Sequence, residues 1–246
     1  MKRRYAFIFA LAITAIIAVD TFLFSIDLSP SREKVKISRI IDGDTLELED
    51  GRKIRFLNIN APEKNQPGHE LAIEYLKNYE NKTLEIEVTG IDKYDRTLAR
   101  IYALDYLNLE LVKRGFVSKF LVDDSELKTF SNAEKEAIGK SLGIWEKSRY
   151  YDCVDSEINE KEEYVIITNN CNKVNISSWS LKDESRKIYQ FRDIETGRII
   201  LHTGYGKDNK TDLFWNLETS VWNNDRDSLY LFDKEKNIAN YNSYGY

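Results

Sequence analysis

The chain of 246 residues contains few of the side chains on which much enzyme chemistry depends: two His, two Cys, one Met and three Pro. A zinc site of four thiolates needs more cysteine than the chain has, and the two His and two Cys are not spaced as zinc ligands. No sequence around either Cys indicates a Cys–His nucleophile pair. Any catalysis is therefore expected to depend on carboxylates, arginine and a hard metal ion.

The charge also differs from that of a typical nucleic-acid-binding protein, because the net charge is −5 and no long segment is strongly basic. Contact with a polyanion would have to come from a local basic cluster or from a metal ion. The apolar fraction of 42% and the charged fraction of 31% are those of a folded globular protein. A disordered or collagen-like chain is excluded.

The N-terminus predicts export. Three basic residues at 2–4 precede an uncharged run at 5–19, and a second apolar stretch follows at 22–26. A positive start before a short apolar region is typical of a secretory signal, whereas the two stretches together reach the length of a membrane span. Residues 1–28 are therefore expected to be a signal peptide or an uncleaved anchor, followed by a linker at 29–34. A buried core helix is the remaining alternative.

Residues 35–149 begin with short alternating segments and end with helical ones. Strand patterns lie at residues 35–39, 45–48, 53–59, 83–88 and 98–102, and helical patterns at 68–79, 109–114 and 125–140. Asp50-Gly51 is a strong hairpin signal between the second and third strands. Five short strands with inserted and covering helices predict an OB-fold, a five-stranded β-barrel with helices in an α+β domain.

Three polar clusters in this region carry chemically useful side chains. The sequence reads Asp-Gly-Asp-Thr at 42–45, Arg-Phe-Leu-Asn-Ile-Asn-Ala-Pro-Glu at 55–63 and Asp-Lys-Tyr-Asp-Arg at 92–96. Each cluster alone is equally compatible with an ordinary turn or a strand end. Together they offer oxygen ligands for a hard cation, a general base and two arginines that can clamp one phosphate.

The order and spacing of these clusters resemble the staphylococcal nuclease (thermonuclease) family, over a region from about residue 35 to 145. The matching motifs are Asp-Gly-Asp-Thr at 42–45, the strand Arg at 55, Asn-Ala-Pro-Glu at 60–63, Asp-Lys-Tyr-Asp-Arg-x-Leu-Ala at 92–99, Leu-Val-x-x-Gly at 111–115 and Gly-Ile-Trp at 143–145. The resemblance implies an OB-fold phosphodiesterase, a calcium-dependent endonuclease that cleaves DNA, RNA or both.

The resemblance also implies roles for single residues. Asp44 and Asn60 would bind Ca²⁺, and Glu63 would orient or deprotonate the attacking water. Arg55 and Arg96 would bind the phosphate and stabilise the charge that develops on it.

Lys93 and Tyr94 would position the nucleotide.

Three departures from the family pattern concern this site. Asn60 stands where the family has a second metal carboxylate, so calcium affinity is expected to fall. Asp95 replaces the usual Gly, and Leu121 falls near the place of a family Tyr. The alternative interpretation is therefore a non-enzymatic surface protein that binds nucleic acid through a weakened nuclease site.

Beyond residue 149 the composition becomes that of an all-β protein. A linker is expected at 150–162, and strand patterns follow at 164–168, 176–181, 187–191, 198–203, 213–215, 228–232 and 237–241. This spacing predicts a sandwich over 163–246. The sequences Ser-Ser-Trp-Ser-Leu at 177–181 and Val-Trp-Asn-Asn-Asp-x-Asp-Ser-Leu at 221–229 resemble the lamin-tail domain, although Ser178 departs from its usual Gly. That resemblance implies an immunoglobulin-like fold that tethers or recruits.

Cys153 and Cys171 flank the first of these predicted strands. In an exported chain they could form a disulfide, and two buried free thiols are the alternative. The protein is expected to be a secreted or membrane-anchored monomer with both folded domains outside the cytoplasm. It would contact DNA or RNA through the barrel, the membrane through an uncleaved N-terminal helix, and a further partner through the sandwich. A purely structural or adhesive envelope protein is a third interpretation.

Overall fold

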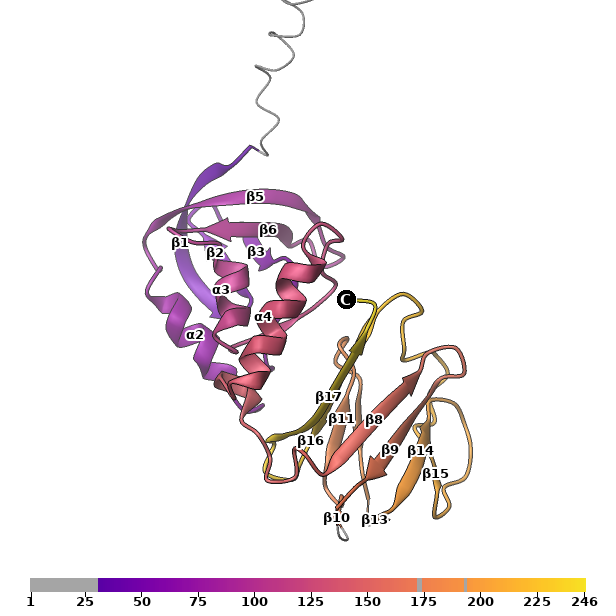
Figure 1. Cartoon of the computed structure of the whole chain (residues 1–246). Helices are drawn as coiled ribbons and strands as arrows, with labels where there is room; N and C mark the ends of the chain where they lie inside the picture. The colour runs from indigo at the N-terminus through magenta and orange to yellow at the C-terminus, as the bar shows by residue number, and fades with distance from the viewer. Residues whose placement is uncertain (1–30, 172–173, 193) are drawn as a thin grey trace, which may run out of the picture. The chain divides into compact units, whose positions relative to one another are not determined.

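The computed structural model describes residues 31–246 except 172–173 and 193 (Figure 1). The expected signal peptide or anchor at 1–28 therefore lies outside the described residues, together with residues 29–30 of the expected linker. Within the part of the chain that the structure describes, no helix is long and apolar enough to cross a membrane.

Five strands close into a barrel in the order β1-β2-β3-β6-β5. They are β1 (Glu33–Asp42), β2 (Thr45–Leu48), β3 (Lys53–Phe56), β5 (Thr83–Ile91) and β6 (Thr97–Tyr102). The β1–β2, β2–β3 and β5–β6 pairs are antiparallel, whereas β3 and β6 are parallel. The expected five-stranded OB-type barrel is confirmed.

Apolar side chains at alternate positions of the strands fill the interior of the barrel. Leu46 and Leu48 on β2, and Ile54 and Phe56 on β3, are at most 2% exposed and belong to one core cluster. Three helices and one short 3-10 helix accompany the strands: α2 (His69–Lys77), α3 (Leu107–Lys113), α4 (Leu127–Gly139) and η1 (Gly143–Trp145). Helices α3 and α4 contribute Leu111 and Phe130 to the same core.

The expected strand at 53–59 is wrong near its end, because the chain turns at residues 57–58. Asn58 has a φ of 66°, a left-handed conformation that ends β3 and separates it from β4 (Ile59–Asn60). Strand β4 then pairs with β7 (Ser118–Lys119) outside the barrel sheet. The amide side chain of Asn58 holds this turn, since it donates to Glu126 Oε2 at 2.7 Å and accepts from the Asp123 N–H at 3.0 Å.

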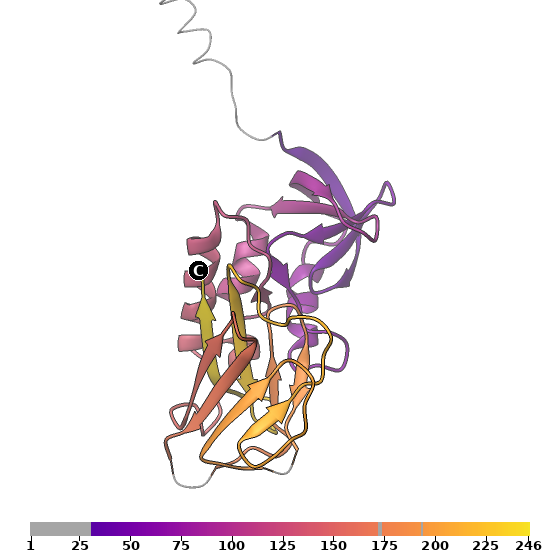
Figure 2. The same ribbon diagram turned by 90° about the vertical axis from the view of Figure 1, so that its right-hand side faces the viewer.

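The C-terminal part consists of β-sheets, as expected (Figure 2). One four-stranded sheet has the order β12-β11-β16-β17 and a second has the order β15-β14-β9-β8. Their strands are β8 (Val154–Asn159), β9 (Tyr164–Asn169), β11 (Ser180–Lys182), β12 (Ile188–Gln190), β14 (Arg198–His202), β15 (Asp212–Phe214), β16 (Asp227–Phe232) and β17 (Ile238–Tyr244). A two-stranded sheet is formed by β10 (Val174–Asn175) and β13 (Glu195–Thr196). Both four-stranded sheets contribute to one apolar core, to which Trp179 and Trp222 also belong.

Two details of this sandwich differ from the sequence expectation. The predicted strand at 176–181 is wrong over its first residues, because Ser178 has a φ of 64° and the chain turns before β11. Strand β8 lies inside the segment expected to be a linker. Its sequence signal is a weak alternation of apolar and polar residues, in which Val154 is buried and Ile158 half-buried.

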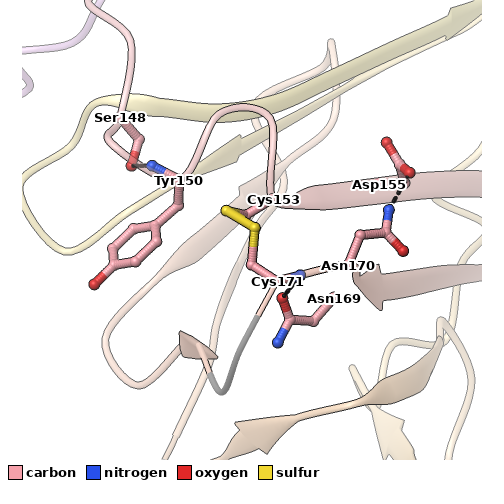
Figure 3. Close-up of a disulfide and its surroundings, with 7 residues drawn as sticks. All are labelled: Ser148, Tyr150, Cys153, Asp155, Asn169, Asn170 and Cys171. Atoms are coloured by element: carbon pink, nitrogen blue, oxygen red, sulfur yellow. Dashed lines mark hydrogen bonds between the residues drawn. A yellow bond between two sulfur atoms is a disulfide. The ribbon is translucent and has the colours of Figure 1, made fainter.

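A disulfide joins Cys153, at the start of β8, to Cys171, which follows β9 (Figure 3). Around it the Asn170 N–H donates to the Cys153 carbonyl at 2.8 Å, and the Cys171 N–H donates to Asn169 Oδ1 at 3.0 Å. The bond therefore ties two neighbouring strands of one sheet together. Of the two alternatives left open by the sequence, the structure contains the disulfide.

Residues Lys34–Tyr246 pack as one compact unit, and the barrel and the sandwich share a small apolar core. Ala137 and Ile138 of α4 and Trp145 of η1 pack with Tyr230 and Ile238 of the sandwich. The backbone continues this contact, because the Ile238 N–H donates to the Glu146 carbonyl at 2.7 Å.

A buried charged group lies at the same junction. Lys119 and Glu134, both of the barrel, are fully buried, and their Nζ and Oε2 atoms are 3.0 Å apart. Lys119 Nζ also donates to Ser228 Oγ and lies 3.5 Å from Glu184 Oε2 in the sandwich. Burial alone would lower the pKa of Lys119, but Glu134, Tyr241 and Glu184 together outweigh it and raise that pKa above its usual value. Because an unpaired buried charge is costly, this cluster fixes how the two parts pack.

Candidate active site

A cavity of about 860 Å³ brings together residues that are widely separated in the sequence. All seven barrel residues singled out from the sequence line it: Asp44, Arg55, Asn60, Glu63, Lys93, Tyr94 and Arg96. Leu121 also lines the cavity and is 62% exposed. The cavity therefore unites the three polar clusters, which lie on β1–β2, on β3 and the loop after β4, and on β5–β6.

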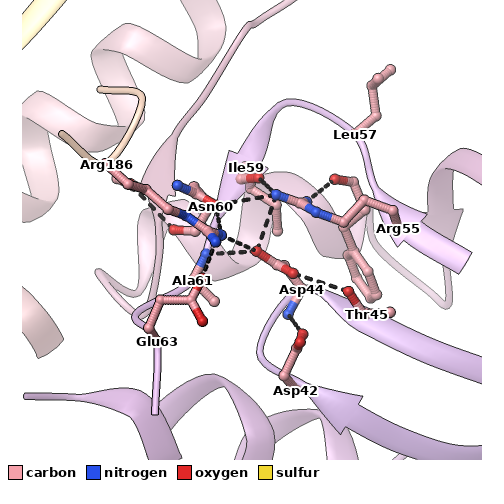
Figure 4. A network of polar contacts seen from close by, with 12 residues as sticks. Asp42, Asp44, Thr45, Arg55, Leu57, Ile59, Asn60, Ala61, Glu63 and Arg186 are labelled. Atoms are coloured by element: carbon pink, nitrogen blue, oxygen red, sulfur yellow. Dashed lines mark hydrogen bonds and ion pairs between the residues drawn. The ribbon is translucent and has the colours of Figure 1, made fainter. Parts of the chain in front are cut away.

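Asp44 sits in the tight turn between β1 and β2. Its side chain is almost fully buried, and Oδ2 accepts a hydrogen bond from the Ala61 N–H at 2.8 Å (Figure 4). The Asp44 N–H in turn donates to Asp42 Oδ1 at 3.0 Å. Gly43 is needed between them, because a Cβ there would lie 2.7 Å from the Ala61 Cβ. Burial, followed by the neighbouring Asp44 charge, raises the pKa of Asp42.

Arg55 extends from β3 beneath the same loop and is 7% exposed. Its Nη2 atom lies 3.1 Å from Asp44 Oδ2, and donates to the Ile59 carbonyl at 2.7 Å and to Asn60 Oδ1 at 3.2 Å. Burial lowers the pKa of Arg55, although Asp44 opposes the effect. Most of its donors are thus used within the protein, so Arg55 holds the side chains of Asp44 and Asn60 in place.

Glu63 differs from these residues in being accessible. It follows Pro62 in the loop after β4, and its side chain is 54% exposed. The loop is held at both ends, since the Glu63 N–H donates to Gln66 Oε1 at 3.0 Å and His69 Nδ1 lies 2.9 Å from the Pro62 carbonyl. A carboxylate that is accessible but carried on a fixed loop can accept a proton from water.

Arg96 is presented by the turn between β5 and β6. Asp92 organises this turn: Oδ1 accepts from the N–H groups of Tyr94 and Arg96, and Oδ2 pairs with the Arg96 guanidinium at 2.7 Å. The Tyr94 ring is 68% exposed and lies 5.1 Å from Lys93 Nζ. Asp95 has a φ of 61°, the conformation that favours the Gly usual in the resembling family.

One residue of the site, Arg186 in the turn between β11 and β12, was not predicted from the sequence. Its Nη2 donates to Asn60 Oδ1 and lies 3.4 Å from Asp44 Oδ2, while Nη1 contacts Glu63 Oε1 (Figure 4). Arg186 is 126 residues from Asn60 in the chain. Its local sequence, Asp-Glu-Ser-Arg-Lys at 183–187, is that of a solvated turn and gave no signal of this contact.

The oxygen atoms of Asp44 and Asn60 suit a hard cation. Ca²⁺ binds carboxylate and amide oxygens, and here two guanidiniums, those of Arg55 and Arg186, already reach both side chains. Among the described residues no group of three His, Cys, Asp or Glu could hold a metal ion. Asp44 and Asn60 would offer Ca²⁺ one carboxylate and one amide oxygen, a set weaker in charge than two carboxylates.

A closed five-stranded barrel with an arginine- and carboxylate-lined cavity at its strand ends defines an OB-type protein with a phosphate-compatible site. Residues 53–147 match the family described as staphylococcal nuclease homologue. This chain belongs to that family.

The chain is also similar to two known proteins. The chain is 33% identical over 118 residues to a protein named uncharacterized endonuclease from Escherichia coli O157:H7, a match covering 45% of this chain and 75% of that protein. It is 32% identical over 146 residues to the uncharacterized protein MJ1439 of Methanocaldococcus jannaschii, covering 45% of this chain and 70% of that protein. The expected family resemblance of the barrel is thus confirmed, whereas the lamin-tail resemblance stays a prediction.

Proposed function

We propose that this protein is a calcium-dependent endonuclease that hydrolyses phosphodiester bonds of DNA, RNA or both. The observation that carries the proposal is the convergence of Asp44, Asn60, Glu63 and Arg96 on one cavity. Membership of the staphylococcal nuclease homologue family and the similarity to a protein named endonuclease support it.

In this proposal the protein side chains divide the chemistry between them. Asp44 and Asn60 would hold the calcium ion, which would supply positive charge to offset the charge of the phosphate. Glu63 accepts a proton from water as the water oxygen bonds to phosphorus, and one P–O ester bond breaks. The leaving oxygen takes a proton from solvent. Arg96, whose side chain is 27% exposed, binds the phosphate and stabilises its added negative charge.

The geometry of the cavity supports two further assignments, one for Arg55 and one for Lys93 and Tyr94. Arg55 is a positioning residue, since its donors are taken up by Asp44, Asn60 and backbone carbonyls. Lys93 and Tyr94 lie on the exposed side of the cavity, where a nucleotide base can stack on the Tyr94 ring.

The test is cleavage of single-stranded DNA, duplex DNA and RNA by the purified protein, with Ca²⁺ and with a chelator. Glu63→Gln and Arg96→Ala are expected to lose cleavage while keeping the wild-type melting temperature. Glu74→Gln and Arg198→Ala remove the same charges at exposed positions outside the cavity and serve as controls. Wild-type rates in both site variants would contradict the proposal.

The contact of Arg186 with Glu63 favours a second candidate, a nucleic-acid-binding protein without turnover. Binding would then depend on basic residues around the cavity and would weaken steeply with salt. Salt-sensitive binding with no cleavage of any of the three substrates would support this candidate over the nuclease.

We propose further that the protein is exported and that the C-terminal sandwich, a lamin-tail-like immunoglobulin-type domain, tethers it or recruits a partner. The basic and apolar N-terminus supports export, as does the Cys153–Cys171 disulfide, a bond typical of oxidising compartments. Fractionation of cells into cytoplasm, membrane and medium tests the proposal. N-terminal sequencing of the recovered protein distinguishes a cleaved signal from an anchor, and recovery from the cytoplasm would contradict export.

A further inference from the structure

We propose that Arg186 is an intramolecular cation that competes with Ca²⁺ for the site, so that calcium must displace its guanidinium before the nuclease can act. This inference rests on the proposed function. It assigns to the sandwich a direct role in setting how much calcium the barrel needs.

The contacts of Arg186 coincide with the groups that calcium and water would use. Nη2 reaches Asn60 Oδ1 and Asp44 Oδ2, which are the proposed ligand side chains, and Nη1 reaches Glu63, the proposed base (Figure 4). Arg55 Nη2 already occupies one lone pair of Asn60 Oδ1, so the second guanidinium, that of Arg186, fills the other and leaves none for a metal ion. The arrangement in the structure is therefore one in which the metal position and the base are both engaged.

The turn that carries Arg186 is itself held in place. Asp183 is fully buried, and its Oδ1 accepts from the Lys187 N–H at 2.6 Å. Glu184 is 4% exposed and accepts from the Leu121 N–H of the barrel at 3.1 Å and from the Tyr246 hydroxyl at 2.6 Å. These contacts fix the turn against the barrel beside the cavity.

The backbone of Arg186 adds a second sign of a fixed arrangement. Its φ of 80° lies in the left-handed region, which residues with a side chain adopt only when their surroundings impose it. The side chain beyond this fixed backbone is 37% exposed, compared with 8% for Arg55. The guanidinium can therefore swing into solvent while the turn stays in place, which is what displacement by a metal ion requires.

The local charge balance makes the competition effective. Asp44 and Glu63 contribute two negative charges, and Arg55 and Arg186 contribute two positive charges in direct contact with them. With Asn60 in place of a carboxylate, this group has no net negative charge left for a divalent cation. Removing the positive charge of Arg186 leaves the group with one net negative charge. It also removes the repulsion between that positive charge and Ca²⁺.

The experiment measures calcium binding without any substrate. Isothermal titration calorimetry with CaCl₂ alone is performed on the full chain and on Arg186→Ala and Arg186→Gln, in chelator-treated buffer. Both variants are expected to bind Ca²⁺ roughly tenfold or more tightly than wild type, because a like charge next to the ligands is gone. Arg198→Ala, which removes an exposed arginine of the same sandwich, is expected to match wild type. Melting temperatures confirm that each variant is folded.

Calcium affinity that is unchanged or weaker in both Arg186 variants overturns the inference, as does the absence of calcium binding in all of them. Cleavage assays on the same samples separate this result from the proposed function. Tighter calcium binding with no cleavage by any protein supports the inference while the nuclease proposal fails. Slower cleavage at saturating calcium with unchanged calcium affinity makes Arg186 a phosphate-binding residue and overturns the competition.

Discussion

The indole ring of Trp145 stacks on the phenol ring of Tyr230, with the ring centroids 5.3 Å apart and the ring planes 22° from parallel. Both side chains are 1% exposed, and the Tyr230 hydroxyl donates to Glu134 Oε1 at 3.1 Å. Trp145 lies in η1, near the end of the segment that matches the family, and Tyr230 lies on strand β16 of the sandwich. The two parts of the chain therefore depend on each other for a closed core.

Replacing Tyr230 by Ala is expected to lower the free energy of unfolding by about 3–5 kcal/mol, the usual cost of emptying a buried aromatic position. Tyr230→Phe keeps the ring and removes only the hydrogen bond to Glu134, at a cost of about 1–3 kcal/mol. Urea denaturation followed by tryptophan fluorescence measures both. We expect a single transition for each protein. Two separate transitions, with the barrel melting as in wild type, would show that the parts are independent.

Asn60→Asp is expected to tighten calcium binding by roughly tenfold, because a second carboxylate then faces the ion. The matched control is Asn65→Asp, which adds the same charge in the loop that follows β4, at an exposed position outside the cavity. Calorimetry with CaCl₂ compares the two variants with wild type. Equal effects of the two substitutions would mean that the added charge alone tightens calcium binding and that residue 60 is not a ligand.

Asp95→Gly is expected to stabilise the protein by about 1 kcal/mol, because glycine adopts the left-handed conformation of this turn without steric cost. Asp105→Gly is the control, since residue 105 is also exposed but is not among the residues with a positive φ. Its free energy of unfolding should stay the same or fall. Urea denaturation distinguishes the two, and an equal response at both positions would contradict the expectation.

The barrel and its cavity could be predicted because their signals are local. Asp44, Asn60 and Arg96 each stand at the end of a short alternating segment, and closing five such segments into a barrel brings the strand ends together. The break in the third segment could not be predicted, because the left-handed turn at Asn58 is stabilised by Glu126 from a distant part of the chain.

Arg186 shows the opposite case. Its contact with Asn60 joins residues from two parts of the chain, and the turn around it has the composition of an ordinary exposed hairpin. The contacts of Glu184 with Leu121 and Lys119 place that turn beside the cavity. A sequence pattern records the propensity of a turn, but it does not record which surface the turn will meet.

The buried Lys119 also imposes an order in time. Glu134 is synthesised 15 residues after Lys119, whereas Ser228 follows only after 109 residues. At the usual rate of translation that interval lasts about 5–20 s. The barrel is therefore complete as a polypeptide well before the side chains that cover its lysine exist, and the nascent chain has to keep this charged face in water until strand β16 arrives.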